Sequence, residues 1–67
     1  MQVESSAILD IEYDRVRRRL HVTFVSGDLY AYEEVPARAH RAFLVAESKG
    51  RFFQAEIRDR YPFTKLS

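Results

Sequence analysis

Two short segments of the chain alternate strictly between apolar and polar side chains, and this pattern constrains the fold more than any other feature. Side chains on a β-strand point to opposite faces in turn, so each segment predicts a strand with one buried face and one face in water. The first segment spans residues 9–14 and the second spans residues 20–24. The predicted core positions are Leu9, Ile11 and Tyr13 in the first strand and Leu20, Val22 and Phe24 in the second.

A polar connection at residues 14–17 is short enough to join these strands as an antiparallel hairpin. We expect Tyr13 to pair with Arg18, because this register places both apolar sets on one face. The face in water then carries opposite charges on neighbouring strands, which favours the register. Exposed pairs of this kind contribute only about 0–1 kcal/mol each. The pairs expected on that face are Glu12 with Arg19 and Asp10 with His21.

The stretch DLYAYEEVP, residues 28–36, contains Tyr30 and Tyr32, which must share one face of a third strand. A two-residue turn at Ser26-Gly27 would place both on the face in water, where they would form an aromatic platform. A three-residue loop, Val25-Ser26-Gly27, with the glycine in the left-handed bulge position, would place both in the core. Ser-Gly is a weaker signal for the mirror-image turn than Asn-Gly, which favours the loop. Each hydroxyl would then need a partner or would reach water at the sheet edge.

After the third strand the apolar residues follow helical spacing. This spacing covers residues 35–46, with Pro36 at a favoured first-turn position. Gly50 is expected to end the helix, because glycine commonly follows the last helical turn. Phe53 and Ile57 lie four residues apart and predict a short second helix.

These elements predict an α+β fold: a three-stranded antiparallel sheet followed by a helix packed on one face and a short second helix. The chain of 67 residues is expected to form a single domain, residues 1–67, with one small core. A chain of this size buries only roughly 60% of the surface that its unfolded form exposes, so it is marginally stable alone. We expect the last few residues to be frayed.

Composition narrows the possible functions. The chain has no cysteine, which excludes disulfides and thiolate metal ligands. The sequence shows no long apolar run and no signal-peptide pattern, so we expect a soluble, cytoplasmic protein that does not bind membranes. A net charge of +1 argues against a dedicated duplex-DNA binder, whose affinity comes mostly from phosphate neutralisation. Nine of the eleven basic residues are arginine, which suits stacking and forked phosphate contacts.

No set of side chains in the sequence indicates catalysis or a metal site. His21 is predicted on a strand and His40 on the outer side of a helix, and Ser5 and Ser6 have no identifiable base beside them. A nucleophile needs both a base and an orienting group within reach. The acidic face of the first strand is too spread to wrap a hard cation and is expected to pair with arginines. We therefore expect no enzyme, no catalytic residue, no cofactor and no metal.

Short motifs along nearly the whole chain resemble the KTSC domain, a small module attached to the C-terminus of some lysyl-tRNA synthetases and also found as short stand-alone bacterial proteins. The motifs are Ser5-Ser6-Ala7-Ile8, Tyr13-Asp14, Tyr30-x-Tyr32, Val35-Pro36, Ala46-x-Ser48-x-Gly50 and Phe53-x-x-x-Ile57-Arg58. The resemblance implies that Tyr30-x-Tyr32 is the family's signature element, whereas Gln54 stands where asparagine is expected and Glu12 where glycine is common. It implies no catalytic residues, and through the fusion partner it suggests RNA binding.

Two hypotheses for a non-enzymatic binding module follow. In the first, the partner is single-stranded or structured RNA, such as tRNA: basic side chains track phosphates, and the tyrosines, if outward, stack on bases. Replacing both tyrosines with alanine would then abolish binding without unfolding the domain. The expected RNA-contacting residues are Arg17, Arg19, Tyr30, Tyr32, Lys49, Arg51 and Arg58. In the second hypothesis, the open sheet face and the edge strands bind another protein or a second copy of the chain.

Overall fold

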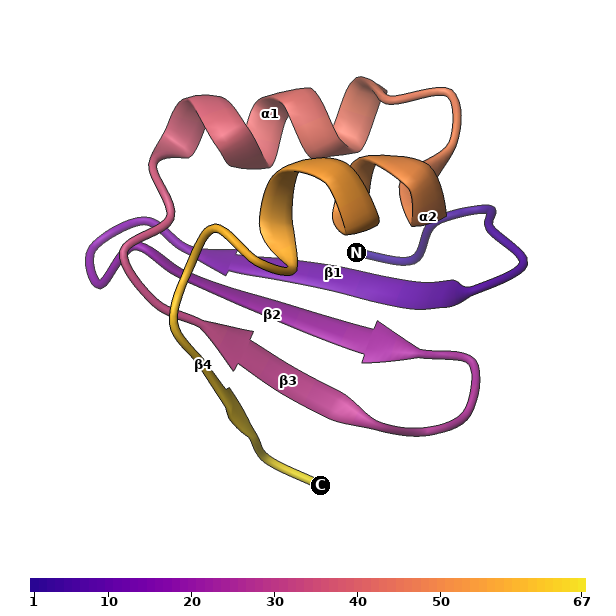
Figure 1. The fold of residues 1–67 in the computed structure, drawn as a ribbon, viewed down its shortest axis with the longest axis horizontal. Helices are drawn as coiled ribbons and strands as arrows, with labels where there is room; N and C mark the ends of the chain where they lie inside the picture. The colour runs from indigo at the N-terminus through magenta and orange to yellow at the C-terminus, as the bar shows by residue number, and fades with distance from the viewer.

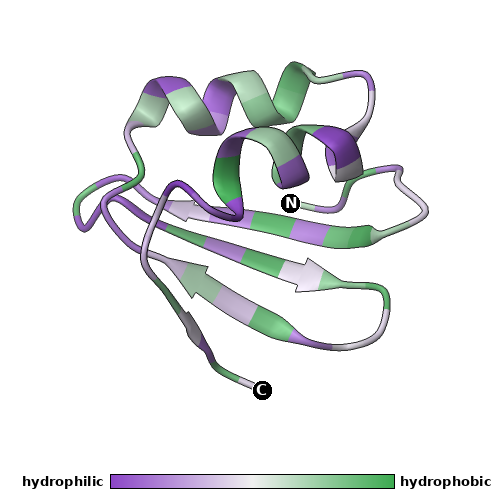
Figure 2. Ribbon diagram, in the orientation of Figure 1, coloured by the Kyte–Doolittle hydropathy of each residue, from purple (hydrophilic) through white to green (hydrophobic).

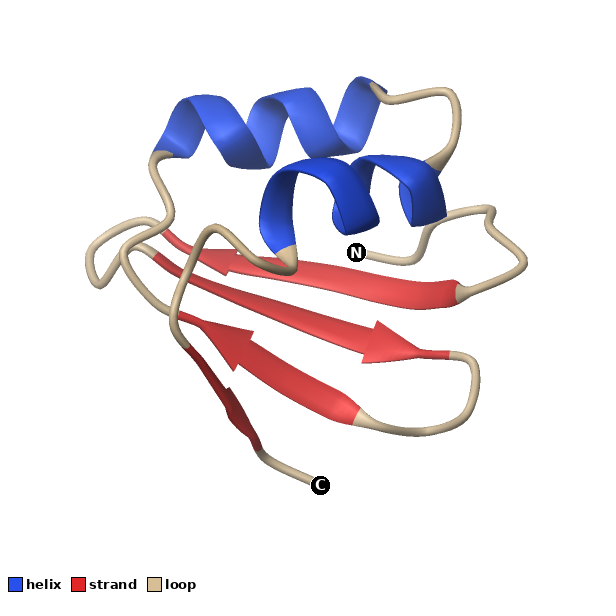
Figure 3. Cartoon of the chain, viewed as in Figure 1, coloured by secondary structure: helices blue, strands red, loops and turns tan.

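The computed structural model describes residues 1–67 and has two layers, an antiparallel sheet with a pair of helices on one of its faces (Figure 1, Figure 3). The strands are β1 (Ile8–Asp14), β2 (Arg19–Phe24), β3 (Leu29–Tyr32) and β4 (Phe63–Lys65), and they lie side by side in that order. The helices are α1 (Ala37–Val45), α2 (Lys49–Phe52) and η1, a π-helical turn (Phe53–Ile57) that continues α2. The expected α+β class is confirmed.

The sheet has one strand more than the sequence predicted. Residues near the C-terminus, expected to be frayed, form β4 and pair antiparallel with β3. This strand is only three residues long and all three are exposed, so it has no alternation of buried and exposed positions that a sequence pattern could reveal. The Glu33 backbone N–H, which donates to the Pro62 carbonyl oxygen at 2.8 Å, holds the chain at the entry to this strand.

The register between β1 and β2 differs from the expected one by two residues. Tyr13 lies opposite Leu20 rather than Arg18. The turn is longer than expected because Arg18 adopts a left-handed conformation (φ 57°), and the Asp14 carboxylate accepts a hydrogen bond from the Arg17 backbone N–H at 3.1 Å. A shift of two residues leaves every side chain on its original face, so the predicted core face survives. The pairs on the open face become Asp10 with Thr23, Glu12 with His21 and Asp14 with Arg19.

A β-bulge near the start of β1 moves one predicted core residue to the surface. The register shifts between Ile8 and Asp10, and Ile8 is fully buried whereas Leu9 is 47% exposed. A bulge places an extra residue in one strand, so the faces of the residues before it are exchanged. The expectation that Leu9 belongs to the core is therefore wrong.

The three-residue loop between β2 and β3 is confirmed at residues 25–27. Gly27 takes the left-handed conformation (φ 97°), and its backbone N–H donates to the Phe24 carbonyl oxygen at 2.9 Å. This loop places Tyr30 and Tyr32 on the core face of the sheet, as the longer-loop alternative predicted. Their partners on β2 are Val22 for Tyr30 and Leu20 for Tyr32.

Gly50 does not end the first helix. Helix α1 ends at Val45, and a new helix begins after Ser48, whose side-chain oxygen accepts a hydrogen bond from the Arg51 backbone N–H at 3.2 Å. Gly50 lies inside α2, because this Ser48 cap starts a helix one residue before it. The predicted second helix is confirmed.

The core lies between the helices and one face of the sheet, and Figure 2 shows the alternation of apolar and polar residues along β1 and β2. It is built from Ile8, Ile11, Leu20, Val22, Tyr32, Val35, Phe43, Phe53 and Ile57. The N-terminal segment covers the outer edge of β1, where Gln2 bridges to Asp10. None of the helices has the length and apolar character needed to cross a bilayer.

Candidate functional site

A groove of about 810 Å³ opens between η1 and the sheet edge formed by β3 and β4. Its volume falls in the range of roughly 300–1,000 Å³ that is usual for small-ligand sites. We call it the aromatic groove. Its floor is formed by Phe24, Tyr30, Tyr32, Phe53 and Phe63, and its polar rim by Ser6, Ser26, Asp28, Gln54, Arg58 and Asp59.

The floor of the groove is a set of packed aromatic rings contributed by four elements. Tyr30 and Tyr32, neighbours on the same face of β3, stack with their ring centroids 6.3 Å apart. Phe53 of η1 meets Tyr32 edge-on at 5.5 Å, and Phe24 of β2 at 5.1 Å. Phe63 of β4 covers both tyrosines at 5.6 and 5.5 Å. Such pairs stabilise the fold by about 0.5–1.5 kcal/mol each beyond simple burial.

The rings differ in how much surface they offer to a ligand. Tyr32 is only 3% exposed, whereas Tyr30 is half-buried and Phe63 is 55% exposed. No buried side-chain oxygen or nitrogen lacks a hydrogen-bond partner, and the Tyr32 hydroxyl makes no hydrogen bond within the protein. That hydroxyl therefore reaches the surface of the groove. A ligand in the groove could therefore contact the aromatic rings of Tyr30 and Phe63, but only the hydroxyl of Tyr32.

Charged groups line the groove on its helical side and influence the Tyr32 hydroxyl. Burial raises the pKa of this hydroxyl above its ordinary value, the Asp59 carboxylate adds to the rise, and the Arg58 guanidinium opposes it. Arg58 donates a hydrogen bond from Nη1 to the Gln54 side-chain oxygen at 2.8 Å. The side chains of Gln54, Arg58 and Asp59 thus form one polar wall above the aromatic floor.

Gln54 also connects the groove to Arg51. A shallower depression next to the groove is lined by Gln54 together with Ser48, Gly50, Arg51 and Ala55. Residues 51, 54 and 58 fall on one face of a helix because they are three and four residues apart. The structure therefore brings four of the sequence-predicted residues together around one surface. They are Tyr30, Tyr32, Arg51 and Arg58.

Lys49 is directed toward a different part of the surface. Its Nζ donates a hydrogen bond to the Ala46 carbonyl oxygen at 2.5 Å, at the end of α1. It lines a small polar depression with the N-terminal residues Ser5 and Ser6. The Ser5 side-chain oxygen in that region accepts hydrogen bonds from the Ala7 and Ile8 backbone N–H groups at 3.2 Å. Lys49 therefore does not belong to the aromatic groove.

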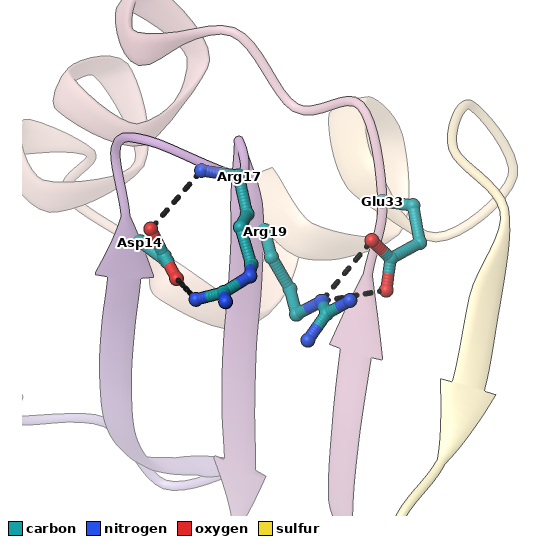
Figure 4. Close-up of polar contacts among 4 residues, drawn as sticks. All are labelled: Asp14, Arg17, Arg19 and Glu33. Carbon is teal, nitrogen blue, oxygen red and sulfur yellow. Dashed lines mark hydrogen bonds and ion pairs between the residues drawn. The ribbon is translucent and has the colours of Figure 1, made fainter.

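Arg17 and Arg19 lie at the hairpin end of the sheet, and each is already paired with a carboxylate (Figure 4). Arg17 forms an ion pair with Asp14 at 3.3 Å, and the Arg19 Nε contacts the Glu33 carboxylate at 2.9 Å. Arg19 alternates along β2 with the buried Leu20, so its side chain is on the sheet face opposite the helices. These two arginines and the aromatic groove do not share a surface.

The two histidines lie outside the groove. His21 is on the open face of the sheet opposite Glu12. His40, expected on the outer side of α1, is instead half-buried and stacks on Tyr13 with ring centroids 4.5 Å apart. Burial lowers its pKa below the ordinary value. The structure shows no group of three or more histidine, aspartate or glutamate side chains positioned to hold a metal ion.

Several groove residues had no role in the site predicted from the sequence, among them Phe24, Phe53, Phe63 and Asp59. Phe24 and Phe53 read as ordinary core positions by their spacing. Phe63 follows Pro62 near the C-terminus, where the sequence predicts frayed residues. The pairing of β4 with β3 is what brings Phe63 over the tyrosines. Asp59 is the second residue after the end of η1, where the helical pattern no longer assigns a face.

Comparison with known proteins gives a consistent assignment. A model of the KTSC domain family matches residues 4–61. The crystal structure of a KTSC domain protein from Yersinia pestis has 42% identical residues and a TM-score of 0.97, and the match covers 100% of this chain and 94% of that chain.

Two further relatives differ greatly in length. A protein of Tsukamurella paurometabola is 41% identical over 59 residues, which is 88% of either chain. A lysine–tRNA ligase of Nostoc punctiforme is 31% identical over 67 residues, which is 100% of this chain and 12% of the ligase. The same sequence pattern therefore occurs both in small proteins and as a minor part of a much larger one.

Proposed function

The chain belongs to the KTSC domain family, and on that basis we propose that it is a non-enzymatic module that binds unpaired RNA in the aromatic groove. One observation carries the proposal: accessible aromatic surface and the Arg58 side chain share one groove, and Arg51 lines the depression next to it. Proteins that bind single strands combine aromatic side chains, on which bases stack, with cations along the backbone path.

The chemistry of the groove fits an unpaired base better than a duplex. Tyr30 and Phe63 offer aromatic surface at the mouth of the groove, and a base can stack on it only when it is free of its own helix. Stacking of this kind contributes about 1–3 kcal/mol per base. Arg51 lines the adjoining depression with Gln54, and in this proposal it contacts a phosphate of the adjoining nucleotide.

The relatives give independent support by association. Lysine–tRNA ligases of Nostoc punctiforme and Trichormus variabilis each contain a region similar to the whole of this chain. A tRNA offers unpaired bases in its loops and at its end. A small module joined to an enzyme that acts on tRNA would find a suitable ligand there.

The proposal is tested by fluorescence anisotropy with a labelled single-stranded RNA of mixed sequence. We expect Tyr30→Ala to weaken binding by roughly 5- to 150-fold, the equivalent of one lost stacking interaction. Tyr30→Phe retains the ring and should bind nearly as the wild type does. Circular dichroism of each variant controls for loss of fold. Absence of RNA binding by the folded wild-type protein would refute the proposal.

Salt dependence separates a specific phosphate contact from general attraction. Each phosphate contact to a single strand contributes about −0.7 to the slope of log affinity against log salt. Arg51→Gln should therefore reduce the steepness of that slope by about 0.7. Arg15→Gln removes the same charge from the exposed hairpin turn at the far end of β1 and serves as the matched control. Equal effects of both variants would contradict a localised site.

A second candidate function is association through β4. This strand is the outer strand of the sheet, all its residues are exposed, and Leu66 just beyond it is 50% exposed. An exposed edge is a template for an added strand from a second copy or another protein. The open sheet face is less suited to such a role because it carries the charged side chains of β1 and β2. Sedimentation analysis over a range of concentrations tests this: a mass that stays monomeric throughout excludes self-association.

A further inference from the structure

The polar wall of the aromatic groove holds a guanidinium and a carboxylate on consecutive residues, and we propose that Arg58 and Asp59 select guanine among the bases of unpaired RNA. This inference rests on the proposed RNA-binding function and specifies which base the groove accepts. It concerns the wall of the groove and not the aromatic floor, which stacks on any base.

Both charged groups remain able to bind a ligand. Arg58 uses Nη1 to donate to Gln54 at 2.8 Å, which fixes the side chain and leaves further N–H groups of the guanidinium free. Asp59 forms no ion pair within the protein. Asp28, the other carboxylate at the rim, is instead 3.6 Å from the Lys65 ammonium. Asp59 is therefore the rim carboxylate that forms no close ion pair, and its oxygens remain available to a ligand.

Guanine matches this pair of groups on two adjoining edges. Its O6 and N7 are acceptors that suit the fork of an arginine. Its N1–H and N2–H₂ groups are adjacent donors that suit the two oxygens of a carboxylate. Adenine and cytosine each place an amino donor beside a ring acceptor, and uracil has a single ring donor. No other base therefore satisfies both Arg58 and Asp59 at once.

The same carboxylate also discriminates against the other bases. A site with a polar group that a ligand leaves unpaired rejects that ligand strongly, because the group has lost its water without gaining a partner. Asp59 lines the same groove as Tyr32 and the other rings of the aromatic floor. A base stacked on the floor without donors facing this wall would leave the carboxylate unpaired.

The test uses single-stranded uridine oligonucleotides of one length that differ only in one central base. We expect the oligonucleotide with guanine to bind about tenfold more tightly than those with adenine, cytosine or uracil. Inosine lacks the 2-amino group and 7-deazaguanine lacks N7, so each should lose a large part of the preference. These arms probe the two edges of the base without any change to the protein.

Asp59→Asn should abolish the preference for guanine while affinity for the uridine oligonucleotide is kept or increased, because a negative charge near phosphate is removed. Asp28→Asn carries the same change at the other side of the rim and should keep the preference. Equal affinity for all four bases, or a preference that persists in Asp59→Asn, would overturn the guanine inference and leave RNA binding intact. Lack of affinity for every oligonucleotide would refute RNA binding itself and the guanine inference with it.

Discussion

Replacing Tyr32 with alanine should remove a large part of the folding stability, rather than leave a stably folded domain that has lost only its ligand. Tyr32 is 3% exposed, belongs to the core cluster, and packs edge-on against Phe53 at 5.5 Å with Phe63 above it. The RNA hypothesis drawn from the sequence, with both tyrosines facing outward, predicted that alanine at both positions would abolish binding without unfolding the domain. The structure revises that expectation because the ring lies inside the core.

The magnitude follows from burial and size. Truncating a fully buried aromatic side chain to alanine costs about 3–5 kcal/mol. A domain of 67 residues, at roughly 0.05–0.15 kcal/mol per residue, has a total free energy of unfolding of about 3–10 kcal/mol. Tyr32→Ala therefore removes a third or more of the stability. The half-buried Tyr30 should cost about half as much, roughly 1.5–2.5 kcal/mol, when truncated in the same way.

Thermal unfolding followed by circular dichroism measures the difference. At about 4–8 °C per kcal/mol for a domain of this size, Tyr32→Ala should lower the Tm by at least ~12 °C. Tyr32→Phe is the control: its hydroxyl lies at the groove surface, so we expect a change within about 0.5 kcal/mol. A Tyr32→Ala protein that melts at the wild-type temperature would refute the packing argument.

Three further perturbations address the turns and the titratable groups. Gly27→Ala should lower the free energy of unfolding, measured with urea, by about 1–2 kcal/mol. The cost comes from the backbone, because Gly27 has φ +97° while an added Cβ would meet nothing within 4 Å. A cost near zero would contradict this backbone conformation. The hydrogen bonds that Asp14 accepts from Arg17 hold its pKa below the ordinary value. Their stabilisation is present above about pH 4 and is lost as pH falls through the lowered pKa, so Asp14→Ala should flatten the acid side of a pH series of Tm values. Burial lowers the pKa of His40 below its ordinary value. Protonation of His40 therefore favours the unfolded chain, so the free energy of unfolding is highest above about pH 6.5 and declines as the pH falls below that value. His40→Phe keeps the stack on Tyr13 and should remove this decline, and an unchanged pH dependence would argue against it.

The fold class was predicted correctly because the periodicity of strands and helices still identifies the buried face when the pairing of two strands is predicted with a small error. A register error of two residues between β1 and β2 left the core face unchanged. The face of Tyr30 and Tyr32 depended on one loop, and the weak turn signal of Ser-Gly pointed correctly to the left-handed Gly27. The alternation of apolar and polar residues could not predict the bulge near Ile8. The bulge exchanges the buried and exposed faces at the start of β1, and it arises from how β1 pairs with β2.

The candidate site was predicted only in part, for a physical reason. The sequence shows which residues are arginines and could therefore contact phosphate. It does not show which side of the sheet each side chain occupies, because that depends on how the strands and helices pack. Arg19 is directed to the open face and satisfied by Glu33, whereas Arg58 is directed toward the groove. The groove itself exists because β4 brings Phe63 over β3, a contact between residues about thirty positions apart that no local pattern encodes.

The most direct test of RNA binding in the aromatic groove is a two-dimensional amide NMR titration of the labelled protein with short single-stranded RNA. The spectrum reports every part of the surface at once and distinguishes the groove from the hairpin end of the sheet. We expect shift changes at Tyr30, Arg51 and Arg58 with neighbouring residues of η1 and β4, weakening as salt is raised, and no change at Arg17 and Arg19. A spectrum that does not move, or changes centred on Arg17 and Arg19, would contradict binding in the groove.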